Sequence, residues 1–141
     1  MRYLEFKIPG KPVAKQRPRH MKNGHTYTPE ETVLYENLVK YCFTEKYPDF
    51  VPDDGPVELR INANFPIPES WPKKKKKMAL DWKIFPGKPD WDNIGKIISD
   101  GLNHIAYKDD SQIHACTVTK RYSDGPCVYV TLILEGGEDD E

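Results

Sequence analysis

The stretch Lys88–Gln112, KPDWDNIGKIISDGLNHIAYKDDSQ, joins a helical hydrophobic pattern to two pairs of aspartates. Its apolar residues recur at helical spacing, at Ile94, Ile97, Ile98, Leu102 and Ile105. This spacing predicts an amphipathic helix over Asn93–Ile105, with Asp92 as its N-cap. The stripe would bury one side of the helix against a core and leave the opposite side polar.

Carboxylates gather around this predicted helix. Asp90 and Asp92 stand at its start, where an extended approach would direct both side chains to the same side. Asp109 and Asp110 follow it, and the returning chain would bring one of them back to the same end. Hard oxygen ligands of this kind suit Mg²⁺ or Mn²⁺, and Mg²⁺ takes few carboxylates and keeps several waters. Three such groups would repel one another without a metal, so the cluster predicts a metal site.

Two further charged residues extend along the polar face of the helix. Lys96 lies one turn after Asp92, and Asp100 lies one turn further on. Lys96 would supply a positive charge for a bound phosphate group. Plain structural interpretations stay open: Asp92 as a helix cap, Lys96 as an i,i+4 partner of either aspartate, and the later acidic pair as a turn. An EF-hand loop is excluded, because Ile94 occupies the next ligand position.

Four segments have the patterns of strands. Residues 3–8 and 57–65 alternate between apolar and polar side chains, which predicts two half-buried strands. Another strand is expected around residues 113–121. Residues 127–134, CVYVTLIL, are nearly all apolar or β-branched and predict a strand buried on both faces.

Local signals predict two more helices and a hairpin. Residues 28–31, TPEE, form a capping box with proline at the first helical position. The helix that follows would bury the face that carries Leu34, Leu38, Tyr41 and Cys42. Ser70 is expected to cap a short helix that contains Lys73–Lys77. Asn23-Gly24 is expected to form the tip of a hairpin.

Together these elements predict one small α/β (α+β) domain over residues 1–134, with one mixed sheet and helices packed against it. The chain of 141 residues is long enough for one core and too short for two ordinary domains. No apolar run reaches the ~18–20 residues of a membrane span, and the start does not resemble a signal peptide. Three widely spaced cysteines form neither a zinc pattern nor a disulfide framework, which favours a reducing cytoplasm.

Charge is segregated along the chain, although the net charge is only −1. Residues 135–141, EGGEDDE, are expected to form a disordered acidic tail. Residues 1–134 then carry 21 basic residues against 17 acidic ones.

Two basic segments stand out, and each indicates either contacts with phosphates or a solvated surface. The first carries Lys15, Arg17 and Arg19 near the N-terminus. The second is a run of five consecutive lysines, which are Lys73, Lys74, Lys75, Lys76 and Lys77. With a DNA partner, all eight residues are candidates for contact with the phosphates.

The motif KPDWDNIGKIISDGLN…YKDDSQI resembles the core motif of the RusA family of Holliday-junction resolvases. The family pattern is Asp-x-Asp-Asn, a lysine three residues later, an aspartate in the helix, and an Asp-Asp pair before a strand. The segment PVAKQRPRHMKNGHTYTP is similar to the basic N-terminal segment of that family. The order of elements matches as well, so the resemblance covers most of the chain. Trp91 departs from the pattern, since leucine is common at this position.

The resemblance implies a homodimeric, Mg²⁺-dependent endonuclease that cuts four-way DNA junctions by paired incisions, in a bacterial or phage-infected cell. Mn²⁺ is expected to substitute for Mg²⁺. Asp90, Asp92 and Asp110 match the metal-binding acids, and Lys96 matches the catalytic lysine. The residues that match the basic segment, and are candidates for DNA contact, are Lys15, Arg17 and Arg19. Asp109 stays an alternative to its neighbour as the last ligand.

Two other functions are compatible with the same residues. One is a nuclease of the same chemistry that acts on flaps or forks. The other is a non-catalytic DNA-binding protein that uses Lys73–Lys77 and the N-terminal basic segment. Clustered carboxylates argue against the second, because simple phosphate binding gains nothing from them.

Overall fold

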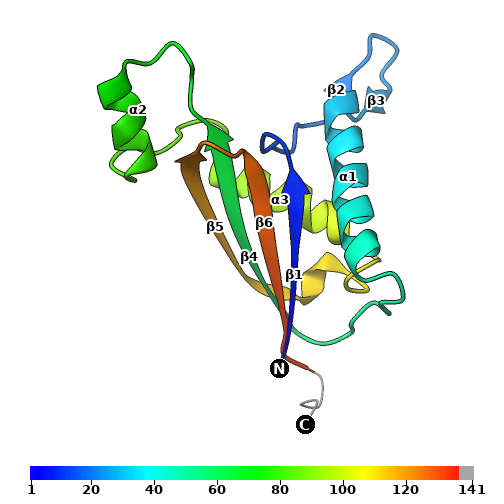
Figure 1. The fold of residues 1–141 in the computed structure, drawn as a ribbon. Coiled ribbons are helices and arrows are strands. Elements are labelled where there is room, and N and C mark those ends of the chain that lie inside the picture. The colour runs from blue at the N-terminus through cyan, green and yellow to red at the C-terminus, as the bar shows by residue number, and fades with distance from the viewer. Residues whose placement is uncertain (137–141) are drawn as a thin grey trace.

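Four strands form one mixed sheet in the computed structural model, which describes residues 1–136 (Figure 1). Their order across the sheet is β1 (Arg2–Pro9), β6 (Cys127–Leu134), β4 (Val57–Pro66) and β5 (Ile113–Ser123). β6 pairs antiparallel with both β1 and β4, whereas β4 and β5 are parallel. The parallel pair requires a crossover, which the chain between residues 67 and 112 provides. The predicted α+β class with one mixed sheet is confirmed.

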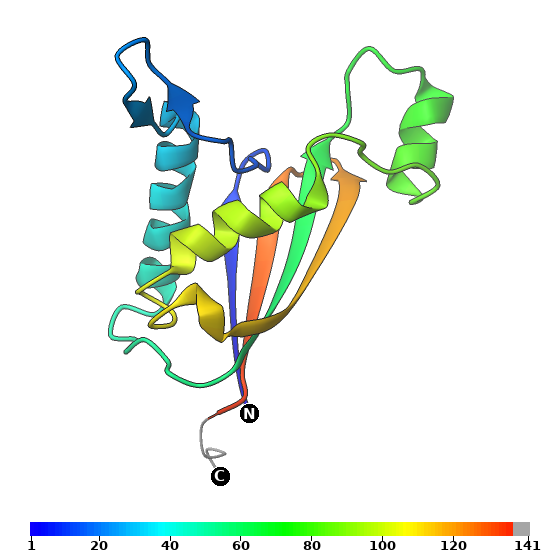
Figure 2. The same cartoon turned by 180° about the vertical axis from the view of Figure 1, so that it is seen from behind.

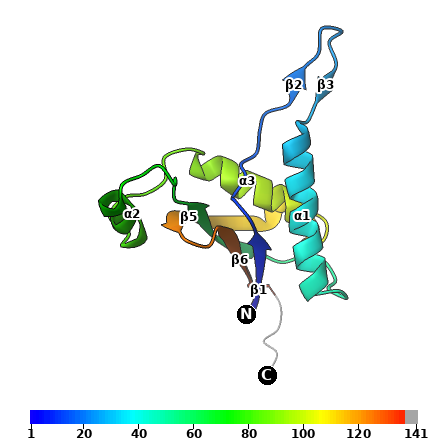
Figure 3. The same cartoon turned by 45° about the horizontal axis from the view of Figure 1, so that its top comes forward.

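The remaining elements are α1 (Glu30–Lys46), α2 (Lys73–Leu80), α3 (Trp91–Leu102), the 3₁₀ helix η1 (Asp110–Gln112) and the short strands β2 (Arg19–His20) and β3 (Thr26–Tyr27). Figure 2 shows α3 crossing one face of the sheet, with α1 beside it near the β1 edge. The opposite face, turned to the reader in Figure 1, bears no helix in the described part of the chain. α2 stands beyond the end of β4 and β5, and the predicted hairpin, β2–β3, projects past α1 (Figure 3).

None of the helices within residues 1–136 has the length and hydrophobicity needed to cross a lipid bilayer. Most of the acidic tail expected over residues 135–141 lies outside the described residues.

The hydrophobic core lies between the sheet and helices α1 and α3, and alternating side chains of the strands point into it. Leu4, Phe6 and Ile8 of β1 are buried, and β4 buries every second residue over 57–65. Both predicted alternations are confirmed. The prediction that β6 is buried on both faces holds only in part, because Tyr129 is 47% exposed. This tyrosine lies on the sheet face that carries no helix.

The buried face of helix α1 overlaps only in part with the one predicted, since Leu38 and Cys42 pack against the core but are only partly buried. Its buried residues are Thr32, Tyr35, Val39 and Phe43. Leu34 and Tyr41, expected on the buried face, are 60% and 63% exposed. Apolar side chains occur all round this helix, so their periodicity does not select one face. Packing against β1 and α3 makes that selection.

Helices α1 and α2 each have a proline at the N-cap. α1 has Pro29 at this position and α2 has Pro72, and neither forms a side-chain capping bond. The predicted caps, Thr28 and Ser70, are therefore wrong. An N-cap residue has an extended backbone, with ψ of 141° and 155° here, which the fixed φ of proline permits.

Helix α3 begins earlier and ends earlier than predicted. Asp90 is its N-cap, so Asp92 is not the cap and lies in the first turn. A carboxylate in the first turn is still favoured by the helix dipole. The helix ends at Leu102 instead of Ile105, because the backbone becomes extended at the next residue.

Helices α1 and α3 approach closely at Gly101. A Cβ atom at this position would lie 2.8 Å from both Cβ and Cγ1 of Val39 and 3.3 Å from the backbone oxygen of Glu36. The missing side chain therefore permits the close packing. It also brings the side chain of Glu36 near the polar face of α3, where the candidate site lies.

Replacing Gly101 with alanine is expected to destabilise the fold by about 1–3 kcal/mol, because α1 and α3 must separate to admit the methyl group. Urea denaturation followed by circular dichroism measures this change. Gly125→Ala is the matched control, since its Cβ would meet nothing within 4 Å. Equal small effects in the two variants would show that the helix crossing tolerates a methyl group.

Candidate active site

A pocket of about 270 Å³ opens between α3 and β5. Asp92 and Lys96 of α3 line it together with Asp110 of η1. The residues that complete the wall are Leu59, Trp91, Gly95, Ser99, Ile113 and Cys116. Three of the predicted site residues, two from α3 and one from η1, therefore line one pocket.

Lys96 is held by carboxylates from two elements. Its Nζ atom lies 3.2 Å from Oδ1 of Asp100, one helical turn on, and 3.7 Å from Oδ2 of Asp110. The interpretation of Lys96 as an i,i+4 partner is thus correct for Asp100. The shared ammonium offsets the repulsion between the two carboxylates. Because the Lys96 side chain is 54% exposed, its charge is also accessible from solvent.

Lys15 joins this arrangement from the far side of Asp100. Its Nζ atom lies 2.8 Å from Oε2 of Glu36 and 3.1 Å from Oδ2 of Asp100. Partial burial by itself lowers the pKa of Lys15, but hydrogen bonds to both carboxylates outweigh it and raise the pKa above its ordinary value. The Lys15 backbone N–H also donates to the carbonyl of Asn93 at 2.9 Å. Lys15, a predicted DNA contact, therefore ties the N-terminal segment to α1 and α3.

The two residues of the second acidic pair have different surroundings. Asp109 is the N-cap of η1, and its Oδ2 atom accepts a hydrogen bond from the Ser111 N–H at 2.9 Å. Hydrogen bonding by Ser111 lowers the pKa of Asp109. Gln112 completes the capping box through its side-chain oxygen, which accepts from the Asp109 N–H at 2.9 Å. Asp110 faces Lys96 in the pocket instead, which favours it over its neighbour as a ligand.

Asp90 lies outside the pocket that holds the other predicted acids. It lines a neighbouring cleft with Lys15 and Asn93, and its Oδ1 atom lies 3.2 Å from Nζ of Lys88. The backbone of Asp90 is extended at the N-cap, whereas that of Asp92 is helical. Within residues 1–136, no three carboxylate, histidine or cysteine side chains are close enough to form a ready metal cluster. The structure therefore brings two of the three predicted ligands into one pocket.

The other predicted DNA contacts lie on two outer parts of the molecule. Arg17 and Arg19 are exposed at the base of the β2–β3 hairpin. The five-lysine run makes up most of α2. Its exposed members are Lys73, Lys74, Lys75 and Lys77, whereas Lys76 is half-buried.

None of these five lysines lines the pocket that holds Asp92 and Asp110. Lys74 and its neighbours on α2 are therefore not part of the candidate active site, and any contact that they make with DNA would be outside it. Figure 1 shows the hairpin and α2 on opposite sides of the upper end of the sheet.

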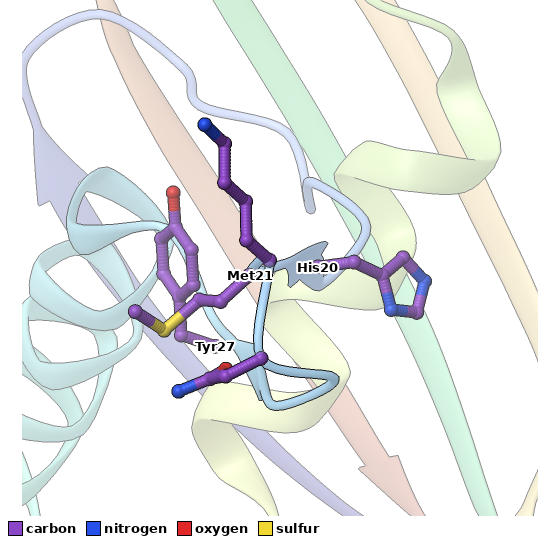
Figure 4. Close-up of a pocket in the computed structure, with 5 residues that line it drawn as sticks. His20, Met21 and Tyr27 are labelled. Atoms are coloured by element: carbon purple, nitrogen blue, oxygen red, sulfur yellow. The ribbon is translucent and has the colours of Figure 1, made fainter.

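A wider cavity of about 670 Å³ lies on the hairpin itself (Figure 4). Its lining residues are His20, Met21, Lys22, Asn23 and Tyr27. It contains no carboxylate and none of the predicted catalytic residues. The predicted catalytic residues Asp92, Lys96 and Asp110 instead line the smaller pocket beside α3.

Three residues that the sequence patterns did not single out support this pocket. Glu36 holds Lys15, as described above. Tyr107 is buried, and its hydroxyl donates to the Ser99 carbonyl at 2.6 Å. Burial, followed by the charges of nearby carboxylates, raises the pKa of Tyr107, so the hydroxyl stays a donor. Gln112 donates to the carbonyls of residues 53 and 55 at 2.7 and 2.9 Å, which anchors η1. Of these three residues, only Gln112 could have been found from the sequence, because its position three residues after Asp109 fits a capping box.

Comparison with known proteins agrees with the motif. The model of the family described as Endodeoxyribonuclease RusA matches residues 9–133. An uncharacterized protein of Bacillus subtilis (strain 168), YqaN, is 36% identical over 135 residues, covering 92% of this chain and 94% of that protein. The chain belongs to the RusA family of endodeoxyribonucleases, and the resemblance read from its motif is confirmed.

Lys15→Met is expected to destabilise the protein by about 1–3 kcal/mol, because Glu36 and Asp100 would face each other without their shared cation. Urea denaturation measures the loss. Lys108→Met is the control, since its ammonium lies 3.7 Å from Asp54 with both side chains largely exposed. Such an exposed pair contributes little. A loss no larger than that of the control would contradict a stabilising role for Lys15.

Proposed function

We propose that this protein is a Mg²⁺-dependent endodeoxyribonuclease that resolves four-way DNA junctions. The observation that carries the proposal is the pocket in which Asp92 and Asp110 lie beside Lys96, in a chain of the RusA family. Two carboxylates fit Mg²⁺, which proteins often bind through one or two acidic side chains together with substrate phosphates. Mn²⁺, which takes similar oxygen ligands, would substitute.

Asp92 and Asp110 would hold the metal, and Asp90 would complete the ligand set from the adjacent cleft. The ion would supply an activated water and stabilise the leaving oxygen. Lys96 would place its ammonium against the phosphate, where negative charge develops during cleavage. Asp100 orients Lys96 through the 3.2 Å contact, and is itself bound by Lys15 on the other side.

DNA contacts outside the pocket would come from the two outer basic parts of the molecule. Arg17 and Arg19 would meet phosphates from the hairpin, where the planar guanidinium suits phosphate oxygens. Lys73–Lys77 would add sequence-independent, salt-sensitive affinity. Lys15 would contribute indirectly, since its ammonium is engaged by two carboxylates.

A homodimer would suit a four-way junction. Such a junction has approximate two-fold symmetry, and a two-fold pair of subunits would place one metal site on each of two opposed strands. Paired cuts would then follow from the symmetry. Recognition would depend on DNA shape and phosphate positions, because the chain has no known base-reading motif.

Asp92→Asn is expected to slow Mg²⁺-dependent cutting of a synthetic four-way junction by about a thousandfold or more, because a metal ligand is lost. Binding of the junction in EDTA should be retained. Asp54→Asn, an exposed residue outside the pocket, is the control and should cut normally. Normal cutting by Asp92→Asn would refute the assigned site. Faster cutting of flaps or forks than of four-way junctions would instead assign flaps or forks as the substrate.

The second acidic pair provides a separate test. Asp110→Asn is expected to slow cutting about a hundredfold or more, with a raised Mg²⁺ requirement. Asp109→Ala should instead lower the thermal midpoint, because η1 loses its cap, and should cut within a few-fold of the normal rate. Metal titrations and thermal scans on both variants measure these effects. The reverse pattern would assign the ligand to Asp109.

A further inference from the structure

The C-terminal end of α2 places a tryptophan where glycine is usual. Trp82 follows the C-cap residue Asp81 and has a φ of 59°. Its N–H donates to the Ala79 carbonyl at 3.2 Å, and the Lys83 N–H donates to the Met78 carbonyl at 2.9 Å. These two bonds form a Schellman motif, in which the left-handed position is commonly occupied by glycine. A bulky side chain at this φ strains the backbone.

Burial does not compensate for that strain. Trp82 is 54% exposed, so much of its apolar surface remains in contact with water. Its ring is held by Arg121 of β5, whose guanidinium carbon lies 3.9 Å from the ring centroid. The stacked guanidinium orients the indole and places a positive charge against it. The indole is therefore both oriented and accessible.

The pocket beside this ring carries polar groups from the sheet. It has a volume of about 350 Å³ and lies between the end of α2 and the helix-free face of the sheet. The lining residues that matter here are Asn62, Asn64, Trp82, Arg121, Ser123 and Tyr129. We call this the Trp82 pocket. The Asn62 amide is exposed and makes no hydrogen bond within residues 1–136, and the Asn64 amide donates only to the Cys127 sulfur at 3.6 Å.

Positive charge is concentrated on α2, whose C-terminal end lies beside the pocket. Residues 73–83 contain six lysines and one acid, Asp81. Nζ of Lys75 lies 3.9 Å from the Trp71 ring centroid, and that ring packs edge-on against Tyr122 of β5 at 5.2 Å. These contacts fasten the lysine-rich helix to the sheet. An anionic chain along α2 would pass directly beside Trp82.

We infer that the Trp82 pocket binds an unpaired nucleobase of a DNA strand whose phosphates lie along α2. The indole would stack on the base, and the asparagine amides match the donors and acceptors of a base edge. A base paired within a duplex does not expose its face to such a ring. The inference rests on the proposed function for the choice of DNA, and it adds a site on the sheet face opposite α3.

A short fluorescein-labelled oligothymidine, titrated in EDTA and followed by anisotropy, tests this site without cleavage. Trp82→Ala is expected to weaken its binding about tenfold, as loss of one base–aromatic stack does. Affinity for a duplex of the same length should change less than about twofold, since backbone contacts dominate there. Trp82→Phe should retain most of the affinity. Tyr41→Ala, which removes an exposed ring from α1, should bind normally.

Two further variants separate stacking from charge and from folding. Replacing all five residues Lys73–Lys77 by glutamine should weaken the binding of both the oligothymidine and the duplex, and should reduce the salt dependence of both affinities. Trp82→Gly should raise the thermal midpoint by a few degrees while it loses oligothymidine affinity as the alanine variant does. A more stable protein that binds less well cannot be explained by misfolding.

Three results would overturn the inference. Trp82→Ala and Trp82→Gly could bind oligothymidine normally, or could weaken duplex binding to the same degree. Alternatively, Trp82→Ala could shift the oligomeric state in analytical ultracentrifugation, which would assign the pocket to contact with a second copy of the chain. None of these results would bear on the nuclease proposal, because junction cutting in Mg²⁺ is measured separately with Asp92→Asn.

Discussion

The ammonium group of Lys15 connects the N-terminal segment to Glu36 of α1 and to Asp100 of α3. Asp100 lies between two ammonium groups, 3.1 Å from that of Lys15 and 3.2 Å from that of Lys96. Glu36 binds the outer lysine and Asp110 the inner one, so charges alternate in sign from α1 across α3 to η1. Each cation separates two carboxylates that would otherwise repel at short range. These ion pairs therefore offset the repulsion among the carboxylates around the pocket.

This arrangement depends on packing as much as on charge. Gly101 allows α1 to approach α3, and this approach lets Lys15 reach Glu36 and Asp100 together. On the other side, η1 is anchored by Gln112 to the loop before β4. Backbone geometry thus delivers residues from three elements to one polar face. Asp110 lies on the three-residue η1, so this anchoring fixes its place in the pocket.

Strand β5 relates the two sites that the structure suggests. The acidic pocket lies between this strand and α3, while the Trp82 pocket lies on the opposite face of the sheet near the end of the same strand. The lysine-rich α2 stands beyond that end (Figure 1). One edge strand therefore contributes to two surfaces of different chemistry, an acidic one beside α3 and an aromatic and amide-lined one on the other face.

The sequence alone showed the apolar–polar alternation of the strands and the aspartate motif, because strand alternation and residue spacing depend on local geometry. They identified β1, β4, the acids around α3 and the family. The buried face of α1 was not readable, because its apolar residues lie on all sides and the neighbours decide which are covered. Likewise, only the fold directs Asp110 into the pocket and Asp109 into a helix cap, and only the fold assigns Asp90 and Asp92 to neighbouring clefts. Such directions depend on where a helix begins and what it packs against, and these are properties of the assembled structure.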